Sequence, residues 1–255
     1  MHKVSAYVLT FNSEKYLHQV LSALCAMADD VLVLDSGSTD HTHDIVRQFP
    51  GVRLEVHPFT SFREQRIKAE QLCSYDMVLF LDSDEVPDEA FVDSFLQIKQ
   101  EGFEKDAYNI TRRWNVLGRQ VHCVYPVLSP DDPVRVYNKT IASFQDSPHL
   151  HEAPRGFRTL GRVGGEVLHI TFETPGELAR KVEFYSDIAA LDIVSQRKPA
   201  GFIPALVFPL LTWVKWYLVK GGYQDGRVGW VLSVFAFRIV RKKYLKARKL
   251  SSARA

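Results

Sequence analysis

The sequence carries a pair of carboxylates at alternate positions, Asp82 and Asp84, whose placement suggests chemistry. They follow directly on residues 77–81, a run of Met, Val, Leu, Phe and Leu that is typical of a buried strand. In open α/β sheets, ligands bind beyond the carboxyl ends of the strands. Two carboxylates at such a place form the hard-oxygen site that Mg²⁺ or Mn²⁺ prefers, often shared with substrate phosphates. The pair therefore predicts a divalent-metal site, and a solvated acidic loop is the alternative.

A second acidic motif, Asp-Ser-Gly-Ser-Thr-Asp at residues 35–40, follows the apolar run 31–34 and should lie on the same edge of the sheet. A turn at Gly37 and a helix cap at Asp40 would explain part of it. Capping does not require Asp35, and a carboxylate there suits the hydroxyls or ring N–H of a nucleotide. The sequence contains neither G-x-G-x-x-G nor G-x-x-x-x-G-K-[ST], which argues against dinucleotide-binding and P-loop proteins.

The elements that must position these motifs alternate along the first hundred residues. The patterns predict strands at residues 4–11, 31–34, 52–57 and 77–81, and helices at 14–27 (capped by Ser13), 42–48, 62–73 and 88–100. Such alternation indicates βαβ units and a parallel sheet. Beyond residue 106 we expect strands at 108–111, 134–137 and 167–170, and an amphipathic helix at 175–196.

Composition and charge describe a folded protein with an unusual tail. The chain has 255 residues, of which 46% are hydrophobic and 24% charged, so it is too apolar to be intrinsically disordered. Residues 199–255 hold 11 Lys or Arg against one Asp, whereas residues 1–198 hold 21 Lys or Arg against 29 Asp or Glu. The net charge of +2 therefore hides an acidic body and a basic, aromatic-rich tail.

The cysteines and the N-terminus predict a cytoplasmic location. Cys25, Cys73 and Cys123 are far apart and lack C-x-x-C spacing, which argues against a disulfide framework or a zinc ribbon. We expect Cys25 and Cys73 to be small core residues. The N-terminus shows no basic region followed by a long apolar run, so no signal peptide is expected.

Three motifs together resemble the family 2 glycosyltransferases of the GT-A fold: Thr10-Phe11-Asn12, residues 35–40 and residues 82–85. The resemblance extends over residues 1–198. Finer features resemble the bacterial lipopolysaccharide-core β-1,4-glucosyltransferase group, namely Gln65-Arg66, His151-Glu152, His169, Lys181 with Tyr185, and residues 220–226 followed by Gly229.

The resemblance implies an α/β fold, a mixed and mainly parallel GT-A sheet flanked by helices. Residues 1–198 would form the glycosyltransferase domain, with a nucleotide-sugar-binding half at 1–105 and an acceptor half at 106–198. Residues 199–255 would form an amphipathic, basic helical region at a membrane surface.

The same resemblance implies an inverting hexosyltransferase. It would move a sugar, glucose in this group, from a nucleotide-diphosphate sugar, with UDP the expected nucleotide, to a lipopolysaccharide inner-core or other lipid-linked saccharide. A divalent metal, Mg or Mn, would assist by neutralising the departing diphosphate, and a carboxylate base would take the proton of the attacking hydroxyl.

Site residues follow from the resemblance position by position. Substrate would contact Thr10, Asn12, Asp35, Gln65, Arg66, Asp82, His151 and Lys181. The metal would be held by Asp84, Asp82 and His169, with Asp84 also counted as catalytic. Glu152 is the candidate base, with Asp146 as the alternative.

Simpler roles compete with several of these assignments. Glu152 could lie in a solvated loop, Gln65 and Arg66 could face solvent on a helix, and Lys181 with Tyr185 could serve local packing. A basic groove for an anionic acceptor is a further hypothesis, resting on the charges of Arg112, Arg113, Arg119 and Arg135.

The sequence of the tail predicts a region that binds at a membrane surface. Residues 202–219 carry one charge, Lys215, and Pro204 and Pro209 are expected to interrupt them. Trp213, Trp216 and Tyr217 favour the headgroup level. A second apolar segment at 230–237 precedes the basic residues Arg238, Arg241, Lys242, Lys243, Lys246, Arg248 and Lys249.

We therefore expect two monotopic helices on an anionic membrane, at the cytoplasmic face of the bacterial inner membrane. A helical cap on the catalytic domain is the alternative. No nucleic-acid partner is expected, and the oligomeric state is not predicted. Two other functions stay open: a catalytically inactive GT-A-like module that binds sugar or lipid at a membrane, and a metal-dependent nucleotidyltransferase.

Overall fold

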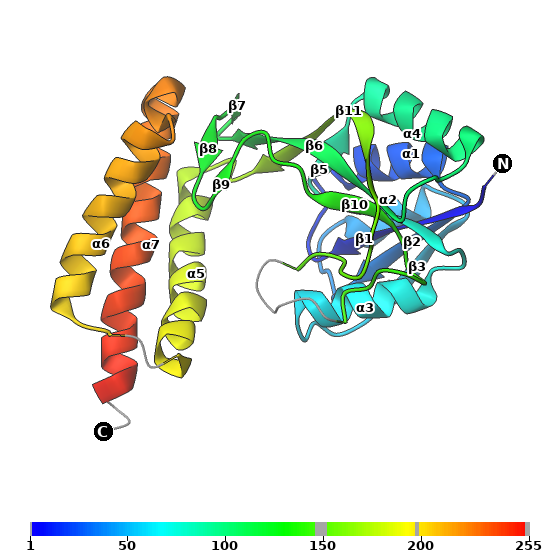
Figure 1. Ribbon diagram of the computed structural model, residues 1–255. Coiled ribbons are helices and arrows are strands. Elements are labelled where there is room, and N and C mark those ends of the chain that lie inside the picture. The colour runs from blue at the N-terminus through cyan, green and yellow to red at the C-terminus, as the bar shows by residue number, and fades with distance from the viewer. Residues whose placement is uncertain (1, 146–151, 197–198, 253–255) are drawn as a thin grey trace. The chain divides into compact units, whose positions relative to one another are not determined.

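The computed structural model describes residues 2–145, 152–196 and 199–252 of the chain (Figure 1). Two compact units account for its internal contacts. The first consists of Met1–Arg112 and Asp132–His169, and the second of Arg113–Asp131 and Ile170–Ala255. Each unit is described by itself below.

The first unit is built on a mixed sheet with the strand order β3-β2-β1-β4-β10-β6-β11-β5. The strands β1 (Val4–Thr10), β2 (Asp30–Asp35), β3 (Val52–Val56) and β4 (Met77–Asp82) are mutually parallel. The remaining strands of that order are β5 (Glu85–Pro87), β6 (Ala107–Val116), β10 (Val134–Asn138) and β11 (Leu160–Thr171). The pairs β10–β4, β10–β6 and β11–β5 are antiparallel. The expected α/β fold with a mixed, mainly parallel first half is confirmed.

Four helices cover this sheet: α1 (Leu17–Met27), α2 (Thr42–Arg47), α3 (Phe62–Leu72) and α4 (Glu89–Glu101). Ser61 and Asp88 begin α3 and α4 by accepting the backbone N–H of Glu64 and Phe91. The expected cap by Ser13 was wrong. Helix α1 begins at Leu17, and the Ser13 hydroxyl instead faces that of Ser83, 2.9 Å away.

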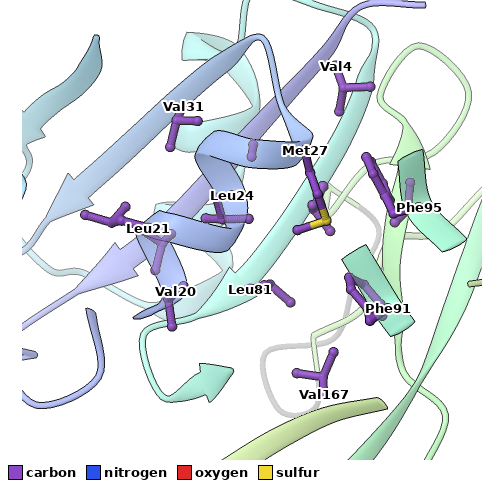
Figure 2. Close-up of a cluster of buried hydrophobic side chains, with 14 of the residues drawn as sticks. Val4, Val20, Leu21, Leu24, Met27, Val31, Leu81, Phe91, Phe95 and Val167 are labelled. Atoms are coloured by element: carbon purple, nitrogen blue, oxygen red, sulfur yellow. The ribbon is translucent and has the colours of Figure 1, made fainter. Parts of the chain in front are cut away.

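Both faces of the sheet are buried, which explains why its central strands are apolar without alternation. On one face, Val4 and Leu81 pack with α1 and α4, and Figure 2 shows the α1 side chains reaching Phe91 and Phe95. The other face is aromatic and includes Tyr7, Phe80, Tyr137 and Phe144. Burying each such side chain stabilises the fold by about 1.5–3 kcal/mol, so this core holds the carboxyl ends of the strands rigidly.

The second unit contains the short strands β7 (Arg119–Gln120), β8 (Cys123–Val124) and β9 (Val127–Leu128) and three long helices. These are α5 (Pro175–Ser195), α6 (Phe202–Val214), which continues as a π-helical turn over Lys215–Val219, and α7 (Gly226–Ser252). Helix α7 packs against both α5 and α6 (Figure 1). The core between α5, α7 and the strands includes Val124, Leu178 and Phe235.

Glycines and a carboxylate shape the start of α7. A Cβ on Gly229 would overlap the carbonyl oxygen of Gly222, so the backbone can approach this closely only without a side chain. The buried Asp225 carboxylate accepts the backbone N–H of His122 at 3.0 Å and lies 2.6 Å from its Nδ1. These contacts give residues 220–229 a structural role within the second unit.

Several expectations for the second unit were wrong. The prolines do not interrupt the apolar segment: Pro204 lies in the first turn of α6, where no backbone N–H is needed, and Pro209 lies inside the helix. Helix α7 begins at Gly226, ahead of the apolar segment noted at 230–237. The two compact units divide the chain at places other than residue 198, because α5 packs with α7. The functional division into a glycosyltransferase domain and a membrane-surface region stays a prediction.

The cysteines differ in burial. Cys73 and Cys123 are buried, whereas Cys25 is exposed on α1, so Cys25 is not the core residue that was expected. All three are free thiols.

Candidate functional site

The two acidic motifs lie at one edge of the sheet in the first unit. Strands β1, β2 and β4 end there together: Thr10 pairs with Asp35 across β1 and β2, and Leu9 pairs with Asp82 across β1 and β4. The prediction that both motifs share the carboxyl edge is therefore confirmed.

Asp35 organises the loop that follows β2. It is fully buried, and its oxygens accept the hydroxyls of Thr10 (2.7 Å) and Ser38 (2.5 Å) and the backbone N–H groups of Gly37 and Ser38 (both 2.8 Å). His43 Nε2 lies 2.9 Å away. Burial alone would raise the pKa of Asp35, but the hydrogen bonds from Ser38, His43 and Thr10 lower it to about 2. These partners occupy both carboxylate oxygens, so Asp35 shapes the loop whatever else it contacts.

Asn12 joins the two loops of this edge. Its backbone, at a φ of 51°, donates to the Ser38 hydroxyl at 2.8 Å, and its side-chain oxygen accepts the N–H of Thr39 at 2.8 Å. The structure thus brings Thr10, Asn12 and Asp35 together. Asp40 is not the N-cap of α2, which is His41. The Asp40 carboxylate instead accepts the N–H of Thr42, the first residue of that helix, at 3.0 Å.

Asp82 is held between two arginines. Arg66 Nη2 donates to one oxygen at 2.8 Å and Arg135 Nη2 to the other at 3.1 Å. Burial and the nearby Glu85 charge raise the pKa of Asp82, but the two guanidiniums more than compensate and lower it. Arg66 does not face solvent: its side chain is 8% exposed and its guanidinium lies 4.6 Å from the centre of the Phe80 ring.

Below Asp82 lies a buried ion pair that sequence reasoning missed. Glu85 is fully buried and accepts hydrogen bonds from Arg135 Nε (2.9 Å) and Nη2 (2.6 Å) and from Arg112 Nη1 (2.7 Å). Burial would raise the pKa of Glu85, but the charges of Arg135 and Arg112 hold it well below its usual value. The signal was present, because Glu85 directly follows the Asp-Ser-Asp motif; its arginine partners are 27 and 50 residues away.

This ion pair overturns part of one hypothesis. Arg112 and Arg135 were expected to line an acceptor groove, but both guanidiniums are largely buried against Glu85. Together with Arg66 they neutralise the carboxylates of Asp82 and Glu85. Asp84 and Asp35 are further carboxylates at the same edge, so the arginines balance negative charge there.

Asp84 lies beside His169. The antiparallel pairing of β5 with β11 places His169 opposite Glu85, and its Nε2 is 3.4 Å from Asp84 Oδ2. Burial lowers the pKa of His169, but the charge and hydrogen bond of Asp84, with the charge of Glu85, raise it above its usual value. Two adjacent ligands of one cation, each about 2.1 Å from it, lie roughly 3 Å apart. The spacing of the pair would therefore admit a divalent cation, and the assignment of Asp84 and His169 as metal ligands stays a prediction.

The rest of the expected metal set is different. Asp82 directs both oxygens to arginines, and among the described residues no group of three or more His, Cys, Asp or Glu side chains is arranged to hold a metal ion. A cation on Asp84 and His169 would therefore need oxygens from a bound substrate, as Mg²⁺ and Mn²⁺ commonly do.

Gln65 and Lys181 have their own local contacts. The Gln65 amide is buried and donates to the carbonyl oxygens of His57 (3.1 Å) and Pro58 (2.9 Å), which fixes the loop after β3. Lys181 belongs to the second unit, where its ammonium lies 5.8 and 5.7 Å from the ring centres of Phe184 and Tyr185. Its place at the site stays a prediction.

The candidate base is only partly described. Glu152 is partly buried and lies outside helices and strands. His151 and the alternative base Asp146 fall outside the described residues. The assignment of Glu152 stays a prediction.

Comparison with known proteins shows similarity to glycosyltransferases. Residues 5–120, which contain both acidic motifs, match the family model for glycosyl transferase family 2. An uncharacterized glycosyltransferase of Rickettsia typhi is 27% identical over 99% of this chain and 89% of its own length. The lipopolysaccharide core biosynthesis glycosyltransferase LpsC of Rhizobium meliloti is 24% identical over 96% of this chain and 94% of its own.

Solved structures agree in fold. Glucosyl-3-phosphoglycerate synthase of Mycobacterium tuberculosis, in complex with Mn²⁺, UDP and phosphoglyceric acid, superposes with a TM-score of 0.52 at 19% identity, over 78% of this chain and 80% of that one. A second mycobacterial protein gives a TM-score of 0.53 at 18% identity, over 78% and 76%. With the strand order and the acidic motifs at the carboxyl edge, these matches lead to one conclusion: residues 5–120 are similar to family 2 glycosyltransferases, and the fold agrees with the GT-A fold.

Proposed function

We propose that the protein transfers a hexose, with inversion, from a nucleotide-diphosphate sugar to a lipopolysaccharide inner-core or other lipid-linked saccharide. UDP-glucose is the first donor to test. The observation that carries the proposal is the Asp84–His169 pair at the carboxyl edge, in which Asp84 belongs to the segment that matches the family 2 model. The lipopolysaccharide acceptor draws its support from LpsC, which is similar along nearly its whole length.

In this proposal the donor lies across the loops after β1, β2 and β4. Thr10, Asn12 and Asp35 would form the cradle for the nucleoside, with Asp35 acting mainly through the loop that it holds. Asp84 and His169 would hold a Mg²⁺ or Mn²⁺ ion, whose chemistry is to neutralise the charge that develops on the departing diphosphate. Arg66 and Arg135 keep Asp82 in place and balance its negative charge.

The chemical step needs a base on the acceptor side. The acceptor hydroxyl oxygen forms a bond to the anomeric carbon from the face opposite the diphosphate. The bond from that carbon to the diphosphate breaks, and its electron pair stays on the phosphate oxygen. The Glu152 carboxylate would take the hydroxyl proton, a role typically worth about 10²–10⁴-fold in rate.

The second unit supports an acceptor at a membrane. The helix over Phe202–Val219 is long and apolar enough to cross a bilayer, with a mean hydropathy of 1.6, and only 17% of it is buried. Trp213 stacks on Tyr217 at 5.1 Å and meets Trp230 edge-on at 5.3 Å, an aromatic group of the kind found at headgroup level. Helix α7 then supplies basic side chains, each worth about 1 kcal/mol near anionic lipid.

We therefore place the protein at the cytoplasmic face of the inner membrane, bound peripherally through α6 and α7. The α6 side chains that are at least half exposed and apolar form what we call the α6 apolar face: Phe202, Ile203, Leu206, Leu210, Leu211, Leu218 and Val219. Leaving this face in water would forfeit about 25 cal/mol for each Å² of apolar surface.

Product analysis tests the reaction. Purified protein is incubated with Mn²⁺, a truncated lipopolysaccharide acceptor and each of the UDP, GDP, ADP and dTDP sugars. The proposal expects one donor to give a sugar-extended acceptor and free nucleoside diphosphate in equal amounts. Release of pyrophosphate from a nucleoside triphosphate would indicate nucleotidyl transfer instead. Binding of sugar or lipid without any product would indicate an inactive module.

A further inference from the structure

A long groove runs between α5 and α7 on the second unit. One section, of about 230 Å³, is lined by apolar side chains including Leu178 and Val231. The next, of about 470 Å³, reaches Leu245. Both sections share Ala179, Val182, Val234 and Arg238, so they form one continuous depression, here called the α5–α7 groove.

The length of the groove suits an acyl chain. Its α7 wall extends from Trp230 to Leu245, which at 1.5 Å per residue is roughly 22 Å. One leaflet of a bilayer's hydrocarbon core is about 15 Å thick, half of roughly 30 Å. A single extended chain therefore fits within the groove, and the combined size is in the range of ordinary ligand sites, about 300–1,000 Å³.

The charges along the groove suit an anionic headgroup. Arg238, Arg241 and Lys242 line it, against the single carboxylate of Glu183. Glu183 is already paired with Lys242 and with Lys246, which lies 3.0 Å away. Within the described ranges no ion pair is found for Arg238 or Arg241, and both are exposed. The groove thus combines an apolar floor with two available guanidiniums, which can bind a phosphate in a fork geometry.

The geometry points to a lipid site: the α5–α7 groove binds one acyl chain of an anionic phospholipid, with the phosphate held by Arg238 and Arg241. This inference goes beyond the proposed function and rests on it for the location at a membrane. The groove is continuous with the proposed membrane face, because Trp230 lines the groove and also contacts Trp213 and Tyr217. A chain could enter it from the bilayer without crossing water.

The test uses a lipid that is monomeric, so that a binding site is distinguished from a membrane surface. Calorimetry measures binding of dioctanoylphosphatidylglycerol below its critical micelle concentration, with dioctanoylphosphatidylcholine and inorganic phosphate as comparisons. The full chain is used, without any nucleotide sugar. Brominated octanoyl chains should quench the fluorescence of Trp230, and the quenching should fall in Trp230→Phe.

Two variants, each with a control, test the apolar part and the charged part of the groove. Ala179→Phe fills it and should weaken phosphatidylglycerol binding at least about tenfold, whereas Leu191→Phe, exposed on the same helix outside the groove, should not. Arg238→Gln with Arg241→Gln should reduce phosphatidylglycerol binding to the level of phosphatidylcholine. Arg227→Gln with Lys249→Gln removes the same charge from α7 outside the groove and should have little effect. Thermal unfolding of each variant checks that it is folded.

Three outcomes overturn the inference: binding only above the critical micelle concentration, unchanged binding by Ala179→Phe, or equal competition by phosphate alone. A dimer that Ala179→Phe dissociates would show that a second copy of the chain occupies the groove, and would also overturn it. Monomeric lipid binding without sugar transfer would leave the groove standing and contradict the proposed function. Sugar transfer without binding of monomeric lipid would support the proposed function and contradict the lipid site in the groove.

Discussion

Replacing Glu85 by Gln should destabilise the first unit by about 3 kcal/mol. Glu85 accepts three hydrogen bonds from Arg112 and Arg135 and one from the backbone N–H of Asp82, at 2.6–3.1 Å. Gln keeps the shape but removes the charge, and its NH₂ group would face a guanidinium. Breaking a buried ion pair by removing one partner typically costs about 3–5 kcal/mol. We expect the lower end, because one amide oxygen can still accept hydrogen bonds.

Amide hydrogen exchange measures this loss of stability in the first unit itself. All four tryptophans lie in the second unit, so their fluorescence does not report on β1 and β4. A loss of 3 kcal/mol should lower protection in peptides from these two strands by about 100-fold. Glu55→Gln, an exposed change of the same type on β3, should lower it by no more than about twofold. A similarly small effect for Glu85→Gln would refute the reasoning.

The pH dependence gives an independent check of the same carboxylate. The pKa of Glu85 in the folded protein is well below the ordinary value of 4.5. Its ionised form therefore stabilises the fold fully above pH 4.5, and this stabilisation is lost only as the pH falls through the lower, folded-state value. The gap in stability between wild type and Glu85→Gln should be constant from neutral pH down to 4.5 and should narrow below it.

Other predictions concern the second unit and the base. Gly229→Ala should lower the denaturation midpoint followed by tryptophan fluorescence, at a cost of about 3 kcal/mol, because the added methyl group overlaps the backbone of Gly222. Gly176→Ala, whose Cβ would have no neighbour closer than 3.8 Å, should leave the midpoint unchanged. Leu206→Glu, in the α6 apolar face at 74% exposure, should weaken sedimentation with phosphatidylglycerol vesicles at least about tenfold, and Leu160→Glu in the first unit should leave it unchanged. Glu152→Gln should reduce kcat by about 10²-fold or more while donor affinity is kept; equal kcat values would exclude it as the base.

The sequence was enough to predict the first half of the sheet, since buried parallel strands are apolar throughout and the helices between them have amphipathic spacing. The strands end within a residue or two of the predicted places. It also predicted which carboxylates meet, because strand ends of a parallel sheet share one edge. The extent of β6 and β11 was underestimated, because their polar and glycine residues break the apolar pattern.

Long-range ion pairs could not be predicted in the same way. Nothing near Arg135 in the sequence indicates that it contacts Glu85. A charged side chain is expected at the surface unless its buried partner is known. The prediction that Pro204 interrupts the apolar segment was wrong for a related reason. Proline generally breaks helices, but the first turn of α6 tolerates it. The closeness of Gly222 and Gly229 depends on packing that no local pattern encodes.

The most direct test of the central claim is calorimetric binding of nucleotide sugars with and without Mn²⁺, on wild type, on Asp84→Asn and on Asp93→Asn. Asp93 is exposed on α4 and provides the matched control. The account predicts that wild type and Asp93→Asn bind one nucleotide sugar at least about tenfold more tightly with Mn²⁺, and that Asp84→Asn loses this gain. Equal affinity with and without Mn²⁺ in wild type, or an undiminished gain in Asp84→Asn, would contradict it.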